Sequence, residues 1–139
     1  MTKTISIDFD GVIHRYSKGW HDGTIYDEPM EGAFEYIKRL MDEGYCVYVL
    51  STRSPRQIKK WLDYHLWRWD SFSDNDQAVF YSFKPEVIPF WVKTWQKQRI
   101  LGITNRKLPA VAYIDDKAVR FEGRWDMEID AENEETKQP

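Results

Sequence analysis

The stretch ISIDFDGV, residues 5–12, is the part of the sequence that best indicates how this chain folds. Its first three residues form a short apolar pattern typical of a buried strand, and Gly11 breaks that pattern after two acids, Asp8 and Asp10. Residues i and i+2 of a strand point to the same face, so both acids are predicted to project together. Open α/β sheets bind ligands at the carboxyl ends of their strands. The alternative interpretation is a simple Asp-Gly turn without chemistry.

A second apolar run, AVAYI at residues 110–114, also ends in paired acids, Asp115 and Asp116. If the two runs are adjacent parallel strands, the two acidic pairs meet at one edge of the sheet. Such a pocket is rich in carboxylate oxygens and suits a hard divalent cation, with Mg²⁺ as the first choice.

A third run, VYVLSTR at residues 47–53, is predicted to be a buried strand that ends in polar side chains. Two hydroxyls, Ser51 and Thr52, and the guanidinium of Arg53 would lie at its carboxyl end. Hydroxyls, an arginine, a nearby lysine and a metal ion together describe a phosphate site. The alternatives are a helix-capping role for Ser51, for which Ser54 is better placed, and a surface position for Arg53.

Over most of residues 3–125 the chain resembles the haloacid dehalogenase (HAD) superfamily of phosphohydrolases, and within it a compact subgroup common in phage and bacterial genomes. Residues 8–12 match the motif Asp-x-Asp-Gly-[Thr/Val]. Ser51, with Thr52 as the alternative, matches the hydroxyl that closes the second strand. The remaining motifs, an acidic pair closing a later strand and a lysine before that strand, are matched by Asp115, Asp116 and Lys107.

The resemblance implies a role for each matched acid. Asp8 would be the nucleophile that forms an aspartyl-phosphate, and Asp10 would protonate the leaving oxygen and then deprotonate water. Mg²⁺ would lie between Asp8, the backbone carbonyl of Asp10, and Asp115, with Asp116 as an outer or alternative ligand. Ser51 would donate to a phosphate oxygen, and Thr52 and Arg53 would contact the substrate.

The position of the lysine is the open point of this match. Only three residues separate Lys107 from the run that leads to Asp115, so a full strand there would leave Lys107 near the wrong end of the sheet. Either residues 99–104 form a strand that delivers Lys107 to the catalytic edge, or another lysine takes the role. The rival is Lys84, which follows the strand-like residues 79–83.

The predicted fold is one α/β domain over residues 1–125, a Rossmann-like three-layer sandwich with a mostly parallel sheet, HAD-like, with little or no cap. One helix is expected to open at Pro29 and close at Gly44, and a second to begin near Ser54. The resemblance implies that residues 12–28 form a hairpin flap over the site, where His14 and His21 could contact the substrate. Lone histidines in such a flap are more often packing residues than ligands.

An aromatic-rich insertion at about residues 66–98 lies where larger relatives carry a cap. It is compatible with a small lid, a base-stacking platform or a self-association surface, and an extra aromatic core is the simplest alternative. The tryptophans considered for stacking are Trp67, Trp69, Trp91 and Trp95.

The composition of the 139 residues suits one globular domain, with 42% hydrophobic residues and no apolar run long enough to span a membrane. Residues 126–139 hold six acids and one lysine and are expected to be a disordered tail. Removing their net −5 from the formal −3 leaves a body of about +2, which suits an anionic substrate.

The single cysteine, Cys46, and the absence of a visible signal peptide predict a cytoplasmic location.

Together these patterns predict a Mg²⁺-dependent phosphomonoesterase that acts on a small phosphorylated substrate, with nucleotides and polynucleotide ends as candidates. Two alternatives stay open at this point. One is a catalytically idle nucleic-acid-binding module that uses the aromatic insertion, and the other is a phosphotransferase of the same superfamily.

Overall fold

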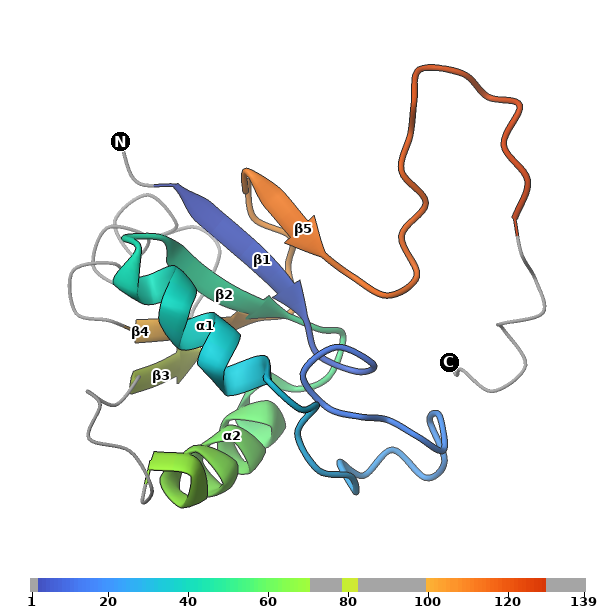
Figure 1. The fold of residues 1–139 in the computed structure, drawn as a ribbon. Helices are drawn as coiled ribbons and strands as arrows, with labels where there is room; N and C mark the ends of the chain where they lie inside the picture. The colour runs from blue at the N-terminus through green and yellow to red at the C-terminus, as the bar shows by residue number, and fades with distance from the viewer. Residues whose placement is uncertain (1–2, 71–78, 83–99, 130–139) are drawn as a thin grey trace.

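The computed structural model describes residues 3–70, 79–82 and 100–129 of the chain. These residues contain five strands and two helices, and the helices separate the first three strands (Figure 1). In order, they are β1 (Thr4–Asp8), α1 (Ala33–Asp42), β2 (Cys46–Leu50), α2 (Pro55–Asp70), β3 (Val79–Ser82), β4 (Ile100–Thr104) and β5 (Ala112–Ile114). The segment expected to carry a cap lies mostly outside these residues, and so do Lys84, Trp91 and Trp95.

The strands form one sheet in the order β3-β4-β2-β1-β5, and every neighbouring pair is parallel. Ile7 of β1 is in register with Val49 of β2 on one side and with Ile114 of β5 on the other. The carboxyl ends of β1, β2 and β5 therefore meet at one edge, as the arrowheads in Figure 1 show. The predicted α/β fold with a parallel sheet is confirmed.

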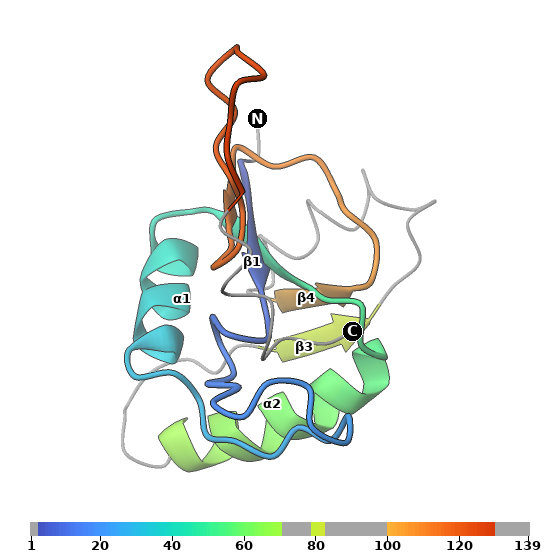
Figure 2. The ribbon, with the colours of Figure 1, turned by 90° about the vertical axis from the view of Figure 1, so that its right-hand side faces the viewer.

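Both helices cover the same face of the sheet (Figures 1 and 2). Val47 and Val49 of β2 point into a core shared with α1 and α2, whereas Cys46 and Tyr48 point to the opposite face. This placement follows from topology, because β1 to β2 and β2 to β3 step in the same direction and right-handed crossovers then put both helices on one side. Within the described residues, the opposite face carries no helix, so the predicted third layer is not found there.

Helix α1 begins at Ala33 rather than at Pro29, so the predicted start was wrong. Pro29 instead pairs with His14 in an isolated β-bridge, and the N–H of Met30 donates to the Ile13 carbonyl at 2.6 Å. Gly32 then takes the N-cap position with φ 85°, a left-handed conformation that glycine adopts without a Cβ penalty. Main-chain bonding to residues 13–14 therefore delays the helix.

The end of α1 agrees with the prediction. Gly44 has φ 94°, and its N–H donates to the Met41 carbonyl at 3.0 Å. The N–H of Tyr45 donates to the Leu40 carbonyl at 3.1 Å, which completes a Schellman motif. This sharp stop lets the chain enter β2 directly, with Cys46 as its first residue.

The second face of the sheet is organised around the buried side chain of Tyr48. Its hydroxyl donates to the Leu108 carbonyl at 2.7 Å and accepts the Leu108 N–H at 3.0 Å. Leu108 is also buried and packs with Cys46 and Ile100. These contacts hold the connection between β4 and β5 against the sheet. Lys107, in that connection, therefore lies at the edge where the acids lie.

Part of the aromatic-rich region belongs to the core. Trp61 of α2 is buried and packs edge-on against Phe9, and its indole N–H donates to the Asp27 carbonyl. Trp69 lies against Phe34 of α1. The extra-core interpretation therefore holds for Trp69 of the predicted insertion, as it does for Trp61 just before it. The stacking hypothesis stays a prediction for Trp67, Trp91 and Trp95.

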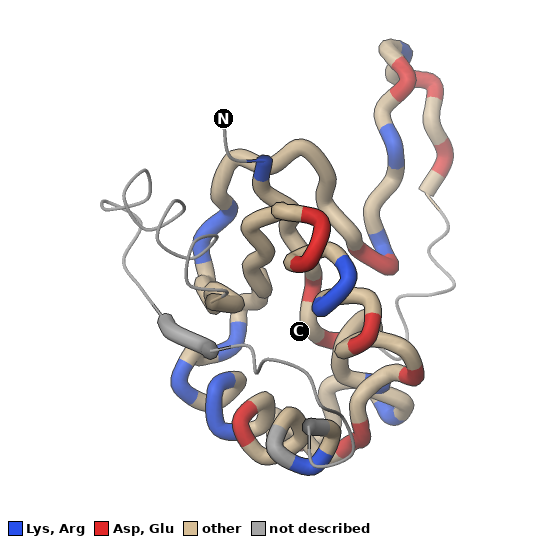
Figure 3. The backbone as a smooth tube through the Cα atoms, turned by 60° about the vertical axis from the view of Figure 1, so that its left-hand side comes forward, with Lys and Arg blue, Asp and Glu red and all other residues tan. Residues whose placement is uncertain are grey.

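Residues 117–129 leave the body as an extended, exposed segment that carries both acidic and basic side chains (Figure 3). Most of the predicted acidic tail, residues 130–139, lies outside the described residues. None of the described helices combines the length and apolar character needed to cross a bilayer.

Tyr48→Phe should lower the free energy of unfolding by about 1–3 kcal/mol, because the buried Leu108 N–H would lose its acceptor. Tyr113→Phe is the matched control. It removes one bond to the same carbonyl from a side chain that is 42% exposed, and it should cost less. Urea unfolding of both variants tests this, and equal losses would show that the Tyr48 hydroxyl does not hold the connection.

Candidate functional site

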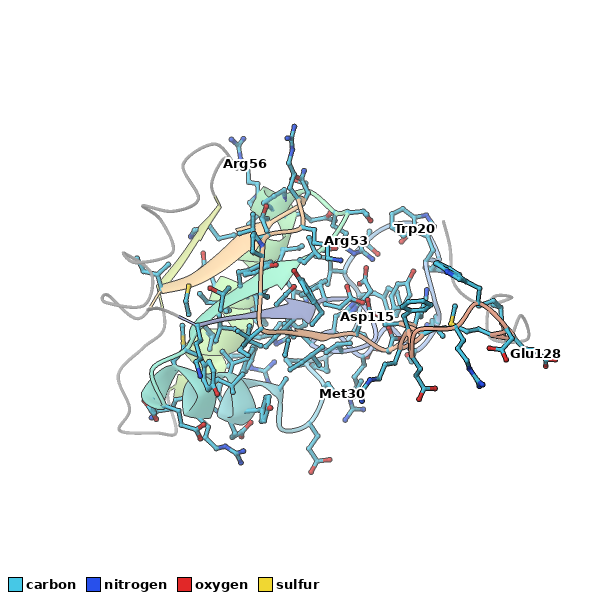
Figure 4. The ribbon with its side chains drawn as sticks, turned by 90° about the horizontal axis from the view of Figure 1, so that it is seen from above. Trp20, Met30, Arg53, Arg56, Asp115 and Glu128 are labelled. Atoms are coloured by element: carbon cyan, nitrogen blue, oxygen red, sulfur yellow. The ribbon has the colours of Figure 1, made fainter. Side chains whose placement is uncertain are left out.

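Three carboxylates meet where β1 and β5 end side by side. Oxygens of Asp8, Asp115 and Asp116 lie within 4.8 Å of one another. Asp8 is the last residue of β1, and the other two directly follow β5, so the parallel register alone brings them together. Figure 4 shows Asp115 and Arg53 at this same end of the sheet, with Glu128 far away on the extended segment.

This trio can hold a divalent cation. All three groups offer carboxylate oxygens, the donors that Mg²⁺ and Ca²⁺ prefer, and three like charges so close together need a compensating positive charge. The side chain of Asp10 does not join the trio, because other residues of the chain bind its oxygens. A ligand role for Asp10 would therefore fall to its backbone carbonyl, as the resemblance implies.

A cavity of about 390 Å³ opens beside the trio. Five of the residues that line it were predicted from the sequence: Asp8, Asp10, Ser51, Thr52 and Lys107. The sequence reasoning missed five others: Tyr16, Trp20, Leu50, Asn105 and Lys117. The missed aromatic residues come from the loop after β1, whose path no periodicity reveals. Lys117 could have been predicted from the sequence, since it directly follows the acidic pair Asp115 and Asp116.

The two acids of the opening motif lie in opposite electrostatic environments. Burial raises the pKa of Asp8 from 3.8 to about 7, and the negative charge of Asp115 adds to the rise. Burial also raises the pKa of Asp10, but hydrogen bonds from His14 and Arg53 and the guanidinium charge outweigh it and lower that pKa below its ordinary value. A cation beside Asp8 would favour its charged form.

The polar residues that follow β2 differ in exposure and in partners. Ser51 is buried, lines the cavity, and its hydroxyl accepts the Arg53 N–H at 3.1 Å. Thr52 is exposed at the cavity wall. Arg53 is buried rather than on the surface, and its guanidinium binds Asp10 and the Gly23 carbonyl. Its predicted contact with substrate stays a prediction.

Lys107 reaches the edge of the sheet where the acids lie, in the way that the first alternative required. Residues 100–104 form β4, which is parallel to β2, and Lys107 follows its carboxyl end. The ammonium lies 4.6 Å from the ring centroid of Tyr113 and at the cavity wall. Lys84, the rival lysine, lies outside the described residues. Lys117 is a further cation beside the trio.

Residues 15–28, here called the cover loop, do not form the predicted hairpin. They are held by turns and side-chain bonds, such as the Arg15 N–H to the Glu28 carbonyl at 3.1 Å, and Tyr16 and Trp20 reach the cavity. His14, just before the loop, is fully buried with both ring nitrogens engaged. His21 is exposed, and its ring lies against Tyr26.

Comparison with family models, with curated proteins and with solved structures gave no match. The functional argument for this chain therefore depends on its own residues and geometry.

In Mg²⁺-free buffer, Asp115→Asn should lower the pKa of Asp8, because it removes the neighbouring negative charge. Asp63→Asn, on the exposed face of α2, is the control and should leave that pKa unchanged. A ¹³C NMR titration of the Asp8 carboxyl carbon measures both. Since folded Asp8 holds its proton more tightly than unfolded Asp8, the wild type should also lose stability as pH rises from about 4 to about 7.

Gly11→Ala should disturb the trio, because Gly11 has φ 85° and a Cβ there would collide with the Asp116 carboxylate. Gly32→Ala is the matched control: it has the same φ, but no atom lies within 4 Å of its added Cβ. Both variants should lose about 1–2 kcal/mol of stability from the positive φ. Only Gly11→Ala should weaken Mg²⁺ binding in calorimetry, and equal affinities would contradict the packing of Asp116 on Gly11.

Proposed function

We propose that this chain is a Mg²⁺-dependent phosphomonoester hydrolase of HAD type that acts through an aspartyl-phosphate on Asp8. The observation that carries the proposal is the juxtaposition of Asp8 with Asp115 and Asp116, at a cavity that Asp10, Ser51 and Lys107 also line. A nucleophile, a second acid, a hydroxyl, a lysine and a cation-binding trio are the parts that phosphoryl transfer needs. The HAD-like three-layer arrangement belongs to this proposal.

The side chains would act in two steps. In the first, a carboxylate oxygen of Asp8 attacks phosphorus, the ester P–O bond breaks, and the leaving oxygen takes a proton from Asp10. Asp10 must bind that proton beforehand, against the lowering of its pKa by His14 and Arg53. In the second, Asp10 takes a proton from water, whose oxygen attacks the same phosphorus and releases phosphate from Asp8. The chain returns to its starting state, so a single acid serves as proton donor and then as proton acceptor.

The remaining residues would hold the phosphoryl group. Lys107 and Lys117 bring positive charge to the cavity wall, and the Ser51 and Thr52 hydroxyls can donate to phosphate oxygens. A divalent cation held by Asp8, Asp115 and the Asp10 backbone carbonyl, with Asp116 beside them, would neutralise phosphate charge. The positive groups are needed because Asp8 must approach an anion with an anionic side chain.

The substrate is proposed to be a small phosphorylated molecule, with nucleotides and polynucleotide ends as the leading candidates. The cavity volume of about 390 Å³ falls in the range of small-molecule sites, and two aromatic side chains, Tyr16 and Trp20, line its wall. Stacking of a base on such a ring would favour nucleotides. The free, buried Cys46 is compatible with the reducing cytoplasm proposed for this enzyme.

The test is a screen of p-nitrophenyl phosphate, nucleotides, sugar phosphates and 3′- or 5′-phosphorylated oligonucleotides, with Mg²⁺ and with EDTA. We expect Mg²⁺-dependent release of phosphate, and a loss of about 10³-fold or more in kcat for Asp8→Asn. Asp63→Asn, an equal charge change far from the cavity, should keep wild-type activity.

Near wild-type turnover by Asp8→Asn, with its fold verified by circular dichroism, would contradict the proposed nucleophile. Oligonucleotide binding without hydrolysis of any ester would favour the binding-module alternative. Transfer of phosphate to an added alcohol in preference to water would favour the phosphotransferase.

A further inference from the structure

Both carboxylate oxygens of Asp10 are held by buried side chains, and each of those side chains also binds the cover loop. His14 Nδ1 lies 2.8 Å from Asp10 Oδ1, and Arg53 Nε lies 2.8 Å from Oδ2. On their other sides, His14 binds the main chain of Asp27, and Arg53 binds that of Gly23. We infer that His14 and Arg53 are positioning residues that couple the orientation of Asp10 to the closed state of the cover loop.

The bonds of His14 fix its tautomer. The main-chain N–H of Asp27 can only donate, so Nε2, at 3.1 Å, must be the acceptor. Nδ1 therefore carries the ring proton and donates it to Asp10. The ring is fully buried, stacked on Phe9 and edge-on to Trp61, so it has little freedom to turn. One rigid ring thus joins Asp10 to the far end of the cover loop.

Arg53 makes the same connection at the middle of the loop. Its Nε–H donates to Asp10 while Nη1 donates to the Gly23 carbonyl at 2.6 Å, and its guanidinium lies 4.9 Å from the ring centroid of Trp20. Trp20 is itself a wall of the cavity. The side chain of Arg53 is 1% exposed, so solvent does not compete with these bonds.

The third nitrogen of the same guanidinium takes no part in these bonds. Nη2 of Arg53 is buried without a hydrogen-bond partner, and a buried unpaired donor is unfavourable for stability. The guanidinium is placed where its Nε and Nη1 bridge Asp10 and the loop.

If Asp10 transfers protons, this coupling makes its activity depend on the position of the cover loop. The carboxylate would be correctly aimed only while the cover loop is closed, with Tyr16 and Trp20 at the cavity wall. The catalytic part of this inference rests on the proposed function, whereas the mechanical coupling between Asp10 and the loop does not.

Hydrogen exchange in metal-free buffer tests the coupling without any substrate. Asp10→Ala should speed exchange of the Asp27 and Gly23 amides by about tenfold or more, because two charge-assisted bonds no longer oppose opening of the loop. Asp116→Ala is the matched control: it removes an acid of the same site that binds neither His14 nor Arg53, and these amides should keep wild-type rates. Unchanged exchange in Asp10→Ala would overturn the coupling.

A pair of His14 variants tests the positioning of Asp10 during catalysis. The amide nitrogen of His14→Asn can replace Nδ1 as the donor to Asp10, whereas the amide oxygen of His14→Gln can replace Nε2 as the acceptor for Asp27. Phenyl phosphate and p-nitrophenyl phosphate are similar in size, but nitrophenol leaves without needing a proton. A misplaced Asp10 should therefore harm hydrolysis of phenyl phosphate more.

We expect His14→Gln to lose about 10²-fold in kcat/KM for phenyl phosphate and little for p-nitrophenyl phosphate. His14→Asn should keep a larger share of the phenyl phosphate activity than His14→Gln, at similar thermal stability. Equal losses on both esters in both variants would mean that His14 only supports the fold, and would overturn the positioning role. Wild-type protein that hydrolyses no ester contradicts the proposed function instead, and hydrogen exchange then decides the coupling.

Discussion

Repulsion among three carboxylates at the ends of β1 and β5 is the constraint on which the rest of the site depends. Parallel pairing places Asp8 beside Asp115 and Asp116, and partial burial of Asp8 strengthens their mutual effect. The fold gains no stability from this arrangement by itself. It becomes favourable when positive charge enters, and the chain supplies Lys107 and Lys117 at the same cavity and leaves the trio open to a cation.

The negative charge of Asp10, unlike that of Asp8, is compensated by neighbouring side chains. Asp10 lies two residues from Asp8 and lines the same cavity, yet its charge is compensated within the protein by Arg53 and by a bond from His14. The site thus contains one carboxylate group, Asp8, that lies beside two further acids, and one, Asp10, whose charge the fold already stabilises. This division separates the group proposed to bond phosphorus from the group proposed to move protons.

Much of the framework could be predicted from the sequence. An apolar run indicates a buried strand, and the acids that follow it mark the carboxyl end of that strand at the edge of the sheet. The pairing of residues 4–8 with 112–114 follows from that pattern, whereas a strand ahead of Lys107 was only one of two alternatives that the sequence left open. Contacts made by the loop after β1 could not be predicted. Main-chain pairing of the loop with Pro29 makes α1 begin later than predicted, and the Asp27 N–H binds the ring of His14. Hydrophobic periodicity predicts neither contact. Arg53 looked like a surface or substrate group, because only the fold shows that Asp10 lies within its reach.

The most direct test of the central claim is ¹⁹F NMR of the protein with beryllofluoride, which bonds to a carboxylate oxygen as a tetrahedral mimic of an aspartyl-phosphate and requires no knowledge of the substrate. The account predicts bound fluorine resonances that require Mg²⁺, persist in Asp63→Asn and disappear in Asp8→Asn. Bound resonances that survive in a folded Asp8→Asn variant, or their absence from the wild type at saturating Mg²⁺, would contradict the assignment of Asp8 as the nucleophile.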